Sequence, residues 1–65
     1  MKQVSEMPTS GQFVMIWMSD EGLCADTMIH NEDGFLCSLI LGEQVDRNEI
    51  IQGAKERDAQ YFIAD

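Results

Sequence analysis

Apolar residues form one unbroken run near the start of the chain, within residues 12–18. Gly11 precedes this segment, and the turn-forming residues 19–22 follow it. A short run that is rich in β-branched and aromatic residues and bounded by turn signals is typical of a strand. Successive side chains of a strand point to opposite sides of a sheet, so this strand is apolar on both faces. Both faces therefore need a cover.

Two further strands are expected, over residues 23–30 and 35–41. The turn between them contains Asp33-Gly34, a pair that suits the positive φ angles of a type I′ hairpin. Residues 11–42 are thus predicted to form a three-stranded antiparallel meander, and residues 1–10 a leader, with Pro8-Thr9-Ser10-Gly11 as a turn-prone entry to the first strand.

The pattern changes at residue 45, where a helix is expected. Asp46 is a favourable N-cap, and Glu49 three residues later completes the pattern of a capping box. Val45 and Ile50 have the spacing of a hydrophobic staple. These signals predict a helix over residues 47–59.

Residues 61–64 then form a last strand, beside the first strand or at a sheet edge. The whole chain, residues 1–65, is predicted to be one α+β domain of order β-β-β-α-β, with residues 46–65 supplying the helix and the last strand. The sheet has three to four antiparallel strands, and the helix packs on one face. Closure of the sheet into a small barrel is the alternative architecture.

Pairing the strands through two-residue turns assigns each side chain to a face. The register places Met15 opposite Asp26, and His30 opposite Cys37. One face then carries Phe13, Met15, Trp17, Cys24, Asp26, Met28, His30, Phe35, Cys37, Leu39 and Leu41. The other carries Val14, Ile16, Met18, Leu23, Ala25, Thr27, Ile29, Leu36, Ser38 and Ile40. A slip of two residues preserves these sets, whereas a slip of one exchanges them on the slipped strand.

The second set is aliphatic and suits a helix lying across it. The first set is aromatic and methionine-rich, a composition enriched at adaptable interfaces. We therefore expect the helix on the aliphatic face, and a partner or a second copy on the face of Phe13, Met15 and Trp17. The alternative is that strand curvature, the leader and the last strand enclose this face.

Charge is unevenly distributed along the chain. The formal net charge is -8, and eight acidic residues but no Lys or Arg lie between residues 3 and 46. Such a surface repels phosphate, which argues against direct nucleic-acid binding. It favours a basic protein surface, including one that normally holds nucleic acid. The alternative is that the acidic residues only maintain solubility.

The candidate partner-binding residues combine carboxylates in place of phosphates with an apolar anchor. They are Asp20, Glu21, Asp26, Glu32, Asp33, Trp17, Phe13 and Met15.

Catalytic and metal sites are not expected. His30 and Cys37 are the one thiol–imidazole pair that the register suggests, and the sequence around them offers no metal-ligand spacing or oxyanion site. Cys24 and Cys37 are predicted to lie roughly 20 Å apart along the hairpin, too far for a disulfide. No cofactor is expected, and neither a signal peptide nor a membrane span is recognisable, which predicts a cytoplasmic protein.

The segment Met7-Pro8-Thr9-Ser10-Gly11-Gln12-Phe13-Val14, followed by Trp17, Asp26-Thr27 and Glu32-Asp33-Gly34, resembles small acidic bacteriophage and prophage proteins. The resemblance covers roughly the first 40 residues, and the helical segment has no counterpart. Its motifs are structural, so no active residues carry over. It implies a phage-type protein, a class that includes inhibitors of host CRISPR effectors, restriction enzymes and polymerase.

The sequence thus predicts a non-enzymatic inhibitor that binds a basic host protein through an acidic, nucleic-acid-mimicking surface in the host cytoplasm. The alternative is a homo-oligomeric structural or adaptor module, such as a homodimer, that uses the Trp17 face as its interface. An enzyme would require a cleft that joins His30 and Cys37.

Overall fold

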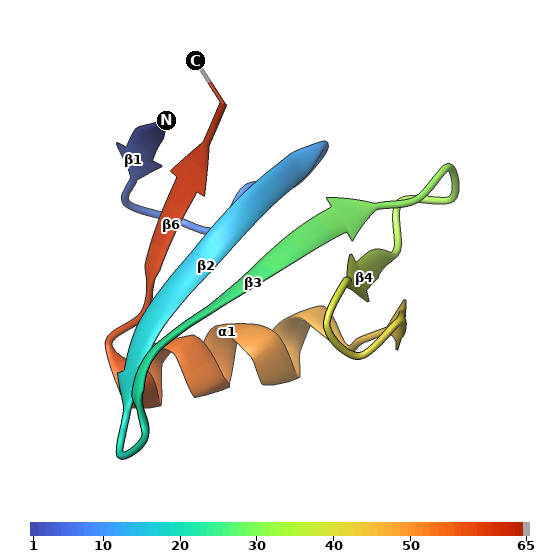
Figure 1. Cartoon of the computed structure of the whole chain (residues 1–65). Helices are drawn as coiled ribbons and strands as arrows, with labels where there is room; N and C mark the ends of the chain where they lie inside the picture. The colour runs from blue at the N-terminus through green and yellow to red at the C-terminus, as the bar shows by residue number, and fades with distance from the viewer. Residues whose placement is uncertain (65) are drawn as a thin grey trace.

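The computed structural model describes residues 1–64, and within them it contains one antiparallel sheet of six strands and one helix (Figure 1). The strands and helix are β1 Lys2–Val4, β2 Gln12–Ser19, β3 Gly22–His30, β4 Leu36–Ser38, β5 Glu43–Gln44, α1 Arg47–Arg57 and β6 Gln60–Ile63. The spatial order is β1-β6-β2-β3-β4-β5. The α+β class is confirmed. The sheet has more strands than predicted, and it is not closed into a barrel.

The two additional strands lie at the two ends of the sheet order. The predicted leader contains β1, which pairs with β6. The predicted strand over residues 35–41 is shorter, because the chain turns after β4 and returns as β5. The last strand, β6, lies beside β2, which is one of the two positions expected for it.

The register of the β2–β3 hairpin is confirmed. Met15 pairs with Asp26, Trp17 with Cys24, and Ser19 with Gly22, as the two-residue turn predicts. Gly22 adopts φ +119, a conformation that L side chains rarely adopt, so the glycine is needed where the turn ends.

The register between β3 and β4 differs from the prediction by one residue. Cys37 pairs with Ile29 instead of His30. The cause is a three-residue loop: the Asn31 amide donates to the Phe35 carbonyl at 2.9 Å, and Gly34 between them is left-handed with φ +84. The Asn31 side-chain oxygen also accepts the Phe35 amide at 2.9 Å. The slip exchanges the faces of β4 and so brings Leu36 and Ser38 to the face of Phe13.

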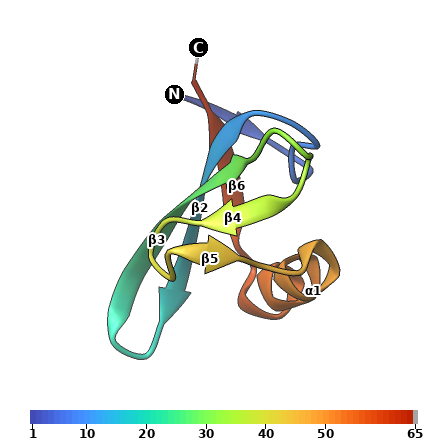
Figure 2. The ribbon, with the colours of Figure 1, turned by 90° about the vertical axis from the view of Figure 1, so that its right-hand side faces the viewer.

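The predicted position of the helix is wrong. Helix α1 covers the face of Phe13 and Met15, and the aliphatic face is left open (Figure 2). The buried apolar residues between helix and sheet are Met7, Phe13, Met15, Met28, Leu36, Ala54 and Tyr61. The slipped β4 and the last strand add Leu36 and Tyr61 to this face, so covering it buries the bulkier side chains and removes more apolar area from water.

The limits of α1 follow from its caps. The Asp46 side chain accepts the Asn48 amide at 2.9 Å, which confirms the predicted N-cap. The helix ends at Arg57, two residues before the predicted end, because Asp58 takes the left-handed conformation with φ 53. No helix among residues 1–64 is long and apolar enough to cross a membrane.

Candidate functional site

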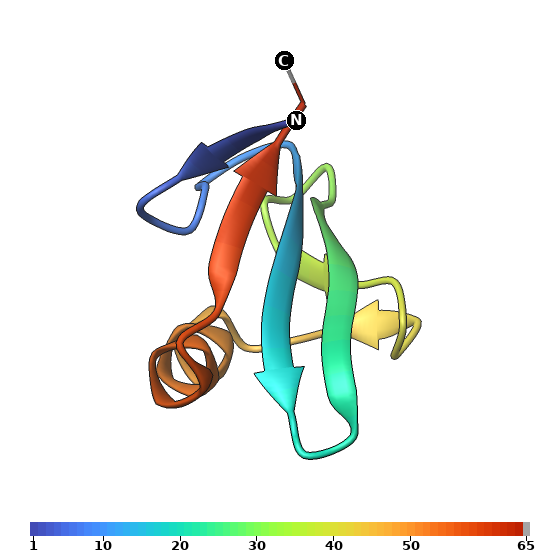
Figure 3. The same cartoon turned by 60° about the vertical axis from the view of Figure 1, so that its left-hand side comes forward.

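The face of the sheet opposite α1 is not covered by any other segment of residues 1–64 (Figures 2 and 3). Strand pairing places one set of side chains on this side of β2, β3, β4 and β6. This surface is called the open face. Its members are Gln12, Val14, Ile16, Met18, Leu23, Ala25, Thr27, Ile29, Cys37, Gln60 and Phe62, with Gln3 of β1 and Gln44 of β5 at the two edges of the sheet. Its centre is apolar apart from the Thr27 hydroxyl and the Cys37 thiol, and the four glutamines lie around this centre.

Apolar exposure is greatest in two places along the open face. Met18 and Leu23 are cross-strand partners next to the β2–β3 turn, and 65 % and 71 % of their surfaces are exposed. The turn between β4 and β5 contributes Leu39, Ile40 and Leu41, each at least 60 % exposed.

A hollow of about 270 Å³ lies between this turn and β3. The residues around it include Ala25 and Thr27 of β3 on one side, and Leu39 and Ile40 of the turn on the other. The open face is therefore not flat: the turn forms a wall beside β3.

Asp26 holds this wall in place. Its carboxylate accepts the Ser38 hydroxyl at 2.5 Å and the Ile40 amide at 3.2 Å. The Leu41 amide in turn donates to the Ser38 hydroxyl at 3.2 Å. Asp26 is only 8 % exposed. Its predicted role as a surface carboxylate is therefore wrong, because its oxygens are used inside the protein to shape the turn.

The other four predicted carboxylates are exposed. Asp20 and Glu21 form the β2–β3 turn, and Glu32 and Asp33 lie in the β3–β4 loop. These two loops lie at opposite ends of β3, about 30 Å apart at the rise of a strand. The four carboxylates therefore do not form one patch; they form two acidic pairs, one at each end of the open face.

The predicted apolar anchor lies on the covered side of the sheet. Phe13 and Met15 are 1 % and 5 % exposed, and Trp17 is half-buried against the same core. Contact with a partner through Phe13 or Met15 would require the helix to leave the sheet. The expectation that this face is an interface is therefore corrected.

His30 and Cys37 lie on opposite faces of the sheet, so they form no thiol–imidazole pair. The His30 ring makes two structural hydrogen bonds instead: Nδ1 donates to the Gly11 carbonyl at 2.9 Å, and Nε2 accepts from the Arg47 guanidinium at 3.2 Å. Cys24 and Cys37 are both free thiols. Residues 1–64 contain no cluster of His, Cys, Asp or Glu that could hold a metal ion.

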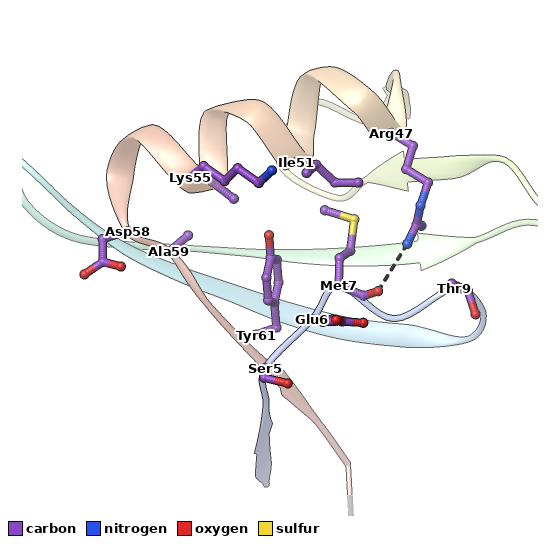
Figure 4. A pocket seen from close by; sticks show the side chains of 11 residues that line it. Ser5, Glu6, Met7, Thr9, Arg47, Ile51, Lys55, Asp58, Ala59 and Tyr61 are labelled. Carbon is purple, nitrogen blue, oxygen red and sulfur yellow. Dashed lines mark hydrogen bonds between the residues drawn. The ribbon is translucent and has the colours of Figure 1, made fainter.

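A second concave site lies on the helix side, between residues 5–9 and α1 (Figure 4). This groove has a volume of about 490 Å³. Arg47 fixes its outer wall, because its guanidinium donates to the carbonyls of Met7 at 3.2 Å and Pro8 at 2.8 Å. No sequence pattern predicted this groove, because it depends on the docking of the leader against the helix.

Tyr61 rises from β6 into the groove (Figure 4). It is 9 % exposed, and this burial raises the pKa of its hydroxyl above the ordinary value, while the positive charge of Arg47 acts in the opposite direction. The groove thus presents a hydroxyl that stays protonated at neutral pH and can donate a hydrogen bond.

Within residues 1–64, the open face lies on one side of the sheet and the groove on the other, and a further hollow of about 440 Å³ lies between residues 34–36 and 44–47. His30 and Cys37 are not brought together. The fold and sequence of the chain were also compared with known proteins. No protein family, curated protein or solved structure matches this chain.

Proposed function

We propose that the protein is a non-enzymatic binding module that docks its open face on a partner protein. The observation that supports this best is an uncovered sheet face with an apolar centre that glutamines surround. The contact on the partner would be an apolar strip with basic residues at its ends. The hollow between β3 and the β4–β5 turn would receive an apolar side chain of the partner.

The exposed area supports an interaction surface. The five exposed apolar residues of the hairpin end and the turn are 60 % to 71 % exposed, which amounts to roughly 600 Å² divided between these two places. The half-buried side chains of Val14, Ile16 and Phe62 add to this area. A specific interface needs about 800 Å² on each partner, so the open face is of suitable size.

Charge favours a basic partner over a second copy. Two sheets that pack face to face keep their strands within about 30° of each other. Because both ends of β3 carry acidic loops, two copies aligned in either direction would bring carboxylates together. A partner with Lys or Arg at both ends of its strip would instead gain from Asp20, Glu21, Glu32 and Asp33.

The inhibitor hypothesis is a special case of this proposal. Enzymes that hold nucleic acid carry basic grooves, and the net charge of -8 would accelerate association with such a surface. A host nucleic-acid enzyme therefore remains a proposed target. The four exposed loop carboxylates would replace phosphates, and Met18 and Leu23 would replace Trp17 as the apolar anchor.

A peptide titration tests the proposal. The probe is a synthetic strand of alternating Leu and Lys, and the comparison probe replaces every Lys by Glu. We expect the Leu/Lys peptide to shift the amide resonances of β2 and β3 and to bind at least ten-fold more tightly than the Leu/Glu peptide. Its affinity should fall as the salt concentration rises. Equal binding of the two peptides, or shifts confined to α1, would refute the proposal.

Variants of the open face provide the control. Leu23→Lys should abolish binding of the Leu/Lys peptide, because it places a cation in the apolar contact. Gln52→Lys adds the same charge at an exposed position of α1, on the other side of the sheet, and should leave most of the affinity. Sedimentation of the unmodified protein at micromolar concentration should give the monomer mass; a dimer that Leu23→Lys dissociates would identify a second copy as the occupant and overturn the proposal.

A further inference from the structure

The groove between residues 5–9 and α1 has the size of a small-molecule site. Its volume of about 490 Å³ lies within the range of roughly 300–1,000 Å³ that is usual for ligand pockets. Its apolar lining comes from Met7, Ile51, Ala54 and Ala59. The leader forms one wall, the helix forms the other, and Tyr61 lies between them (Figure 4).

Two polar groups in the groove have no partner within the protein. The Tyr61 side chain is nine-tenths buried and points toward the helix, and its hydroxyl donates to no residue among 1–64. The Lys55 ammonium extends along the helix toward the same space and forms no ion pair with any described residue. No buried side-chain nitrogen or oxygen of residues 1–64 lacks a partner, so the unpaired Tyr61 hydroxyl is the part of this side chain that reaches the open space of the groove. Both groups are donors that an acceptor on a ligand could bind.

The lining of the groove carries two cations, Arg47 and Lys55, and two carboxylates, Glu6 and Asp58, so the positions of these charges decide which ligand fits. Arg47 uses its donors to hold the leader and His30, yet its charge remains close enough to Tyr61 to oppose the effect of burial on the pKa of that hydroxyl. The two acidic residues of the lining, Glu6 and Asp58, are both exposed, and the Asp58 carboxylate points away from Tyr61 (Figure 4).

From this geometry we infer that the groove binds a small organic monocarboxylate. The carboxylate lies between the Lys55 ammonium and the Tyr61 hydroxyl. The apolar body of the ligand packs on Met7 and Ile51. A monocarboxylate fits better than a phosphate, because the groove offers one cation that is not already committed to structural hydrogen bonds.

This site is independent of the proposed function. The groove lies on the helix side of the sheet, and the open face lies on the other side, so a small ligand and a partner protein would not compete for the same side chains. Failure of one proposal leaves the other intact.

The test uses benzoate and hexanoate as probes on the full chain, with benzamide as the neutral counterpart of benzoate. We expect the two carboxylates to shift the amide resonances of residues 5–9 and 51–61 saturably, and benzamide to bind at least ten-fold more weakly. No saturable shift with either carboxylate, equal binding of benzamide, or tighter binding of benzylamine would each overturn the inference.

Two variants and one matched control assign the contacts. Lys55→Gln and Tyr61→Phe should each weaken the binding of benzoate at least five-fold. Because Lys55 is exposed, its replacement should not affect folding. Arg57→Gln removes the same charge from the same helix outside the groove and should leave the affinity unchanged. If Arg57→Gln weakens benzoate as much as Lys55→Gln, the carboxylate responds only to net charge and the site is refuted.

A spectroscopic measurement tests the role of Tyr61 separately. Tyr61 is the only tyrosine of the chain, so the absorbance of tyrosinate reports its ionisation alone. A carboxylate beside the hydroxyl should raise the pKa of Tyr61 further, because a second negative charge would be unfavourable there. Benzoate that binds without changing this titration would contradict the proposed position of the carboxylate.

Discussion

The two faces of the β2–β3 hairpin are both apolar in sequence, yet only one of them forms the core. On the helix side, the polar groups are paired: Asp26 with Ser38, and His30 with Arg47 and Gly11. No side-chain nitrogen or oxygen buried within residues 1–64 lacks a partner. On the open face the side chains have no such network and remain in contact with solvent. Hydrophobicity alone therefore does not identify the core; the face that also satisfies its polar groups is the buried one.

The largest expected difference between the faces is in stability. Phe13→Ala should lower the free energy of unfolding by about 3–5 kcal/mol, because it leaves a cavity under α1. Met18→Ala, on the same strand but on the open face, should change it by less than about 0.5 kcal/mol. Chemical denaturation measures both.

A loss of that size approaches the whole stability of a domain this small. Phe13→Leu provides a milder change that should keep the protein folded and cost about 1.5 kcal/mol or less. Equal effects at Phe13 and Met18 would show that the open face is covered in solution, and the comparison of the two faces would fail.

The wall beside the open face depends on one buried carboxylate. Asp26→Ala should cost about 2–3 kcal/mol, because the Ser38 hydroxyl and the Ile40 amide lose their acceptor. It should also increase amide exchange in residues 39–42. Asp20→Ala removes the same charge from an exposed turn and should have almost no effect on either measurement. A matching loss in both variants would assign the effect to net charge.

A smaller effect is expected at high pH. Burial raises the pKa of Tyr61 above its unfolded value of about 10. The folded state therefore retains a proton that the unfolded state releases, so this contribution to stability is complete below about pH 10 and is lost as pH rises through the folded pKa. Denaturation at increasing pH should show this decline, and Tyr61→Phe should remove it. A decline that persists in Tyr61→Phe would point to other groups.

The sequence predicted what local chemistry determines. The two-residue turn at Asp20-Glu21 set the β2–β3 register correctly, and Asp46 marked the start of the helix. The next loop failed, because the Asn31 side chain stabilises a three-residue turn that the Asp-Gly pair alone does not reveal. That one-residue slip exchanged the faces of the β4 side chains, so the composition of both sheet faces differs from the prediction.

The functional surfaces were harder to predict than the elements. The four loop carboxylates were correctly placed at the surface, since turns are solvated. Asp26 was not, because only the pairing of β3 with β4 brings Ser38 beside it. The groove could not be predicted for the same reason, because its walls, residues 5–9 and α1, are far apart in the sequence.

Arg47 joins two segments that are far apart in the sequence. Its guanidinium holds the carbonyls of Met7 and Pro8, which lie 40 and 39 residues earlier in the chain. Closing a flexible loop of that length costs on the order of 3 kcal/mol in chain entropy. The Arg47 contacts therefore offset part of the entropy that the first residues lose when they dock on the helix. A ligand in the groove would contact both of these segments, and its binding would stabilise the folded state by mass action.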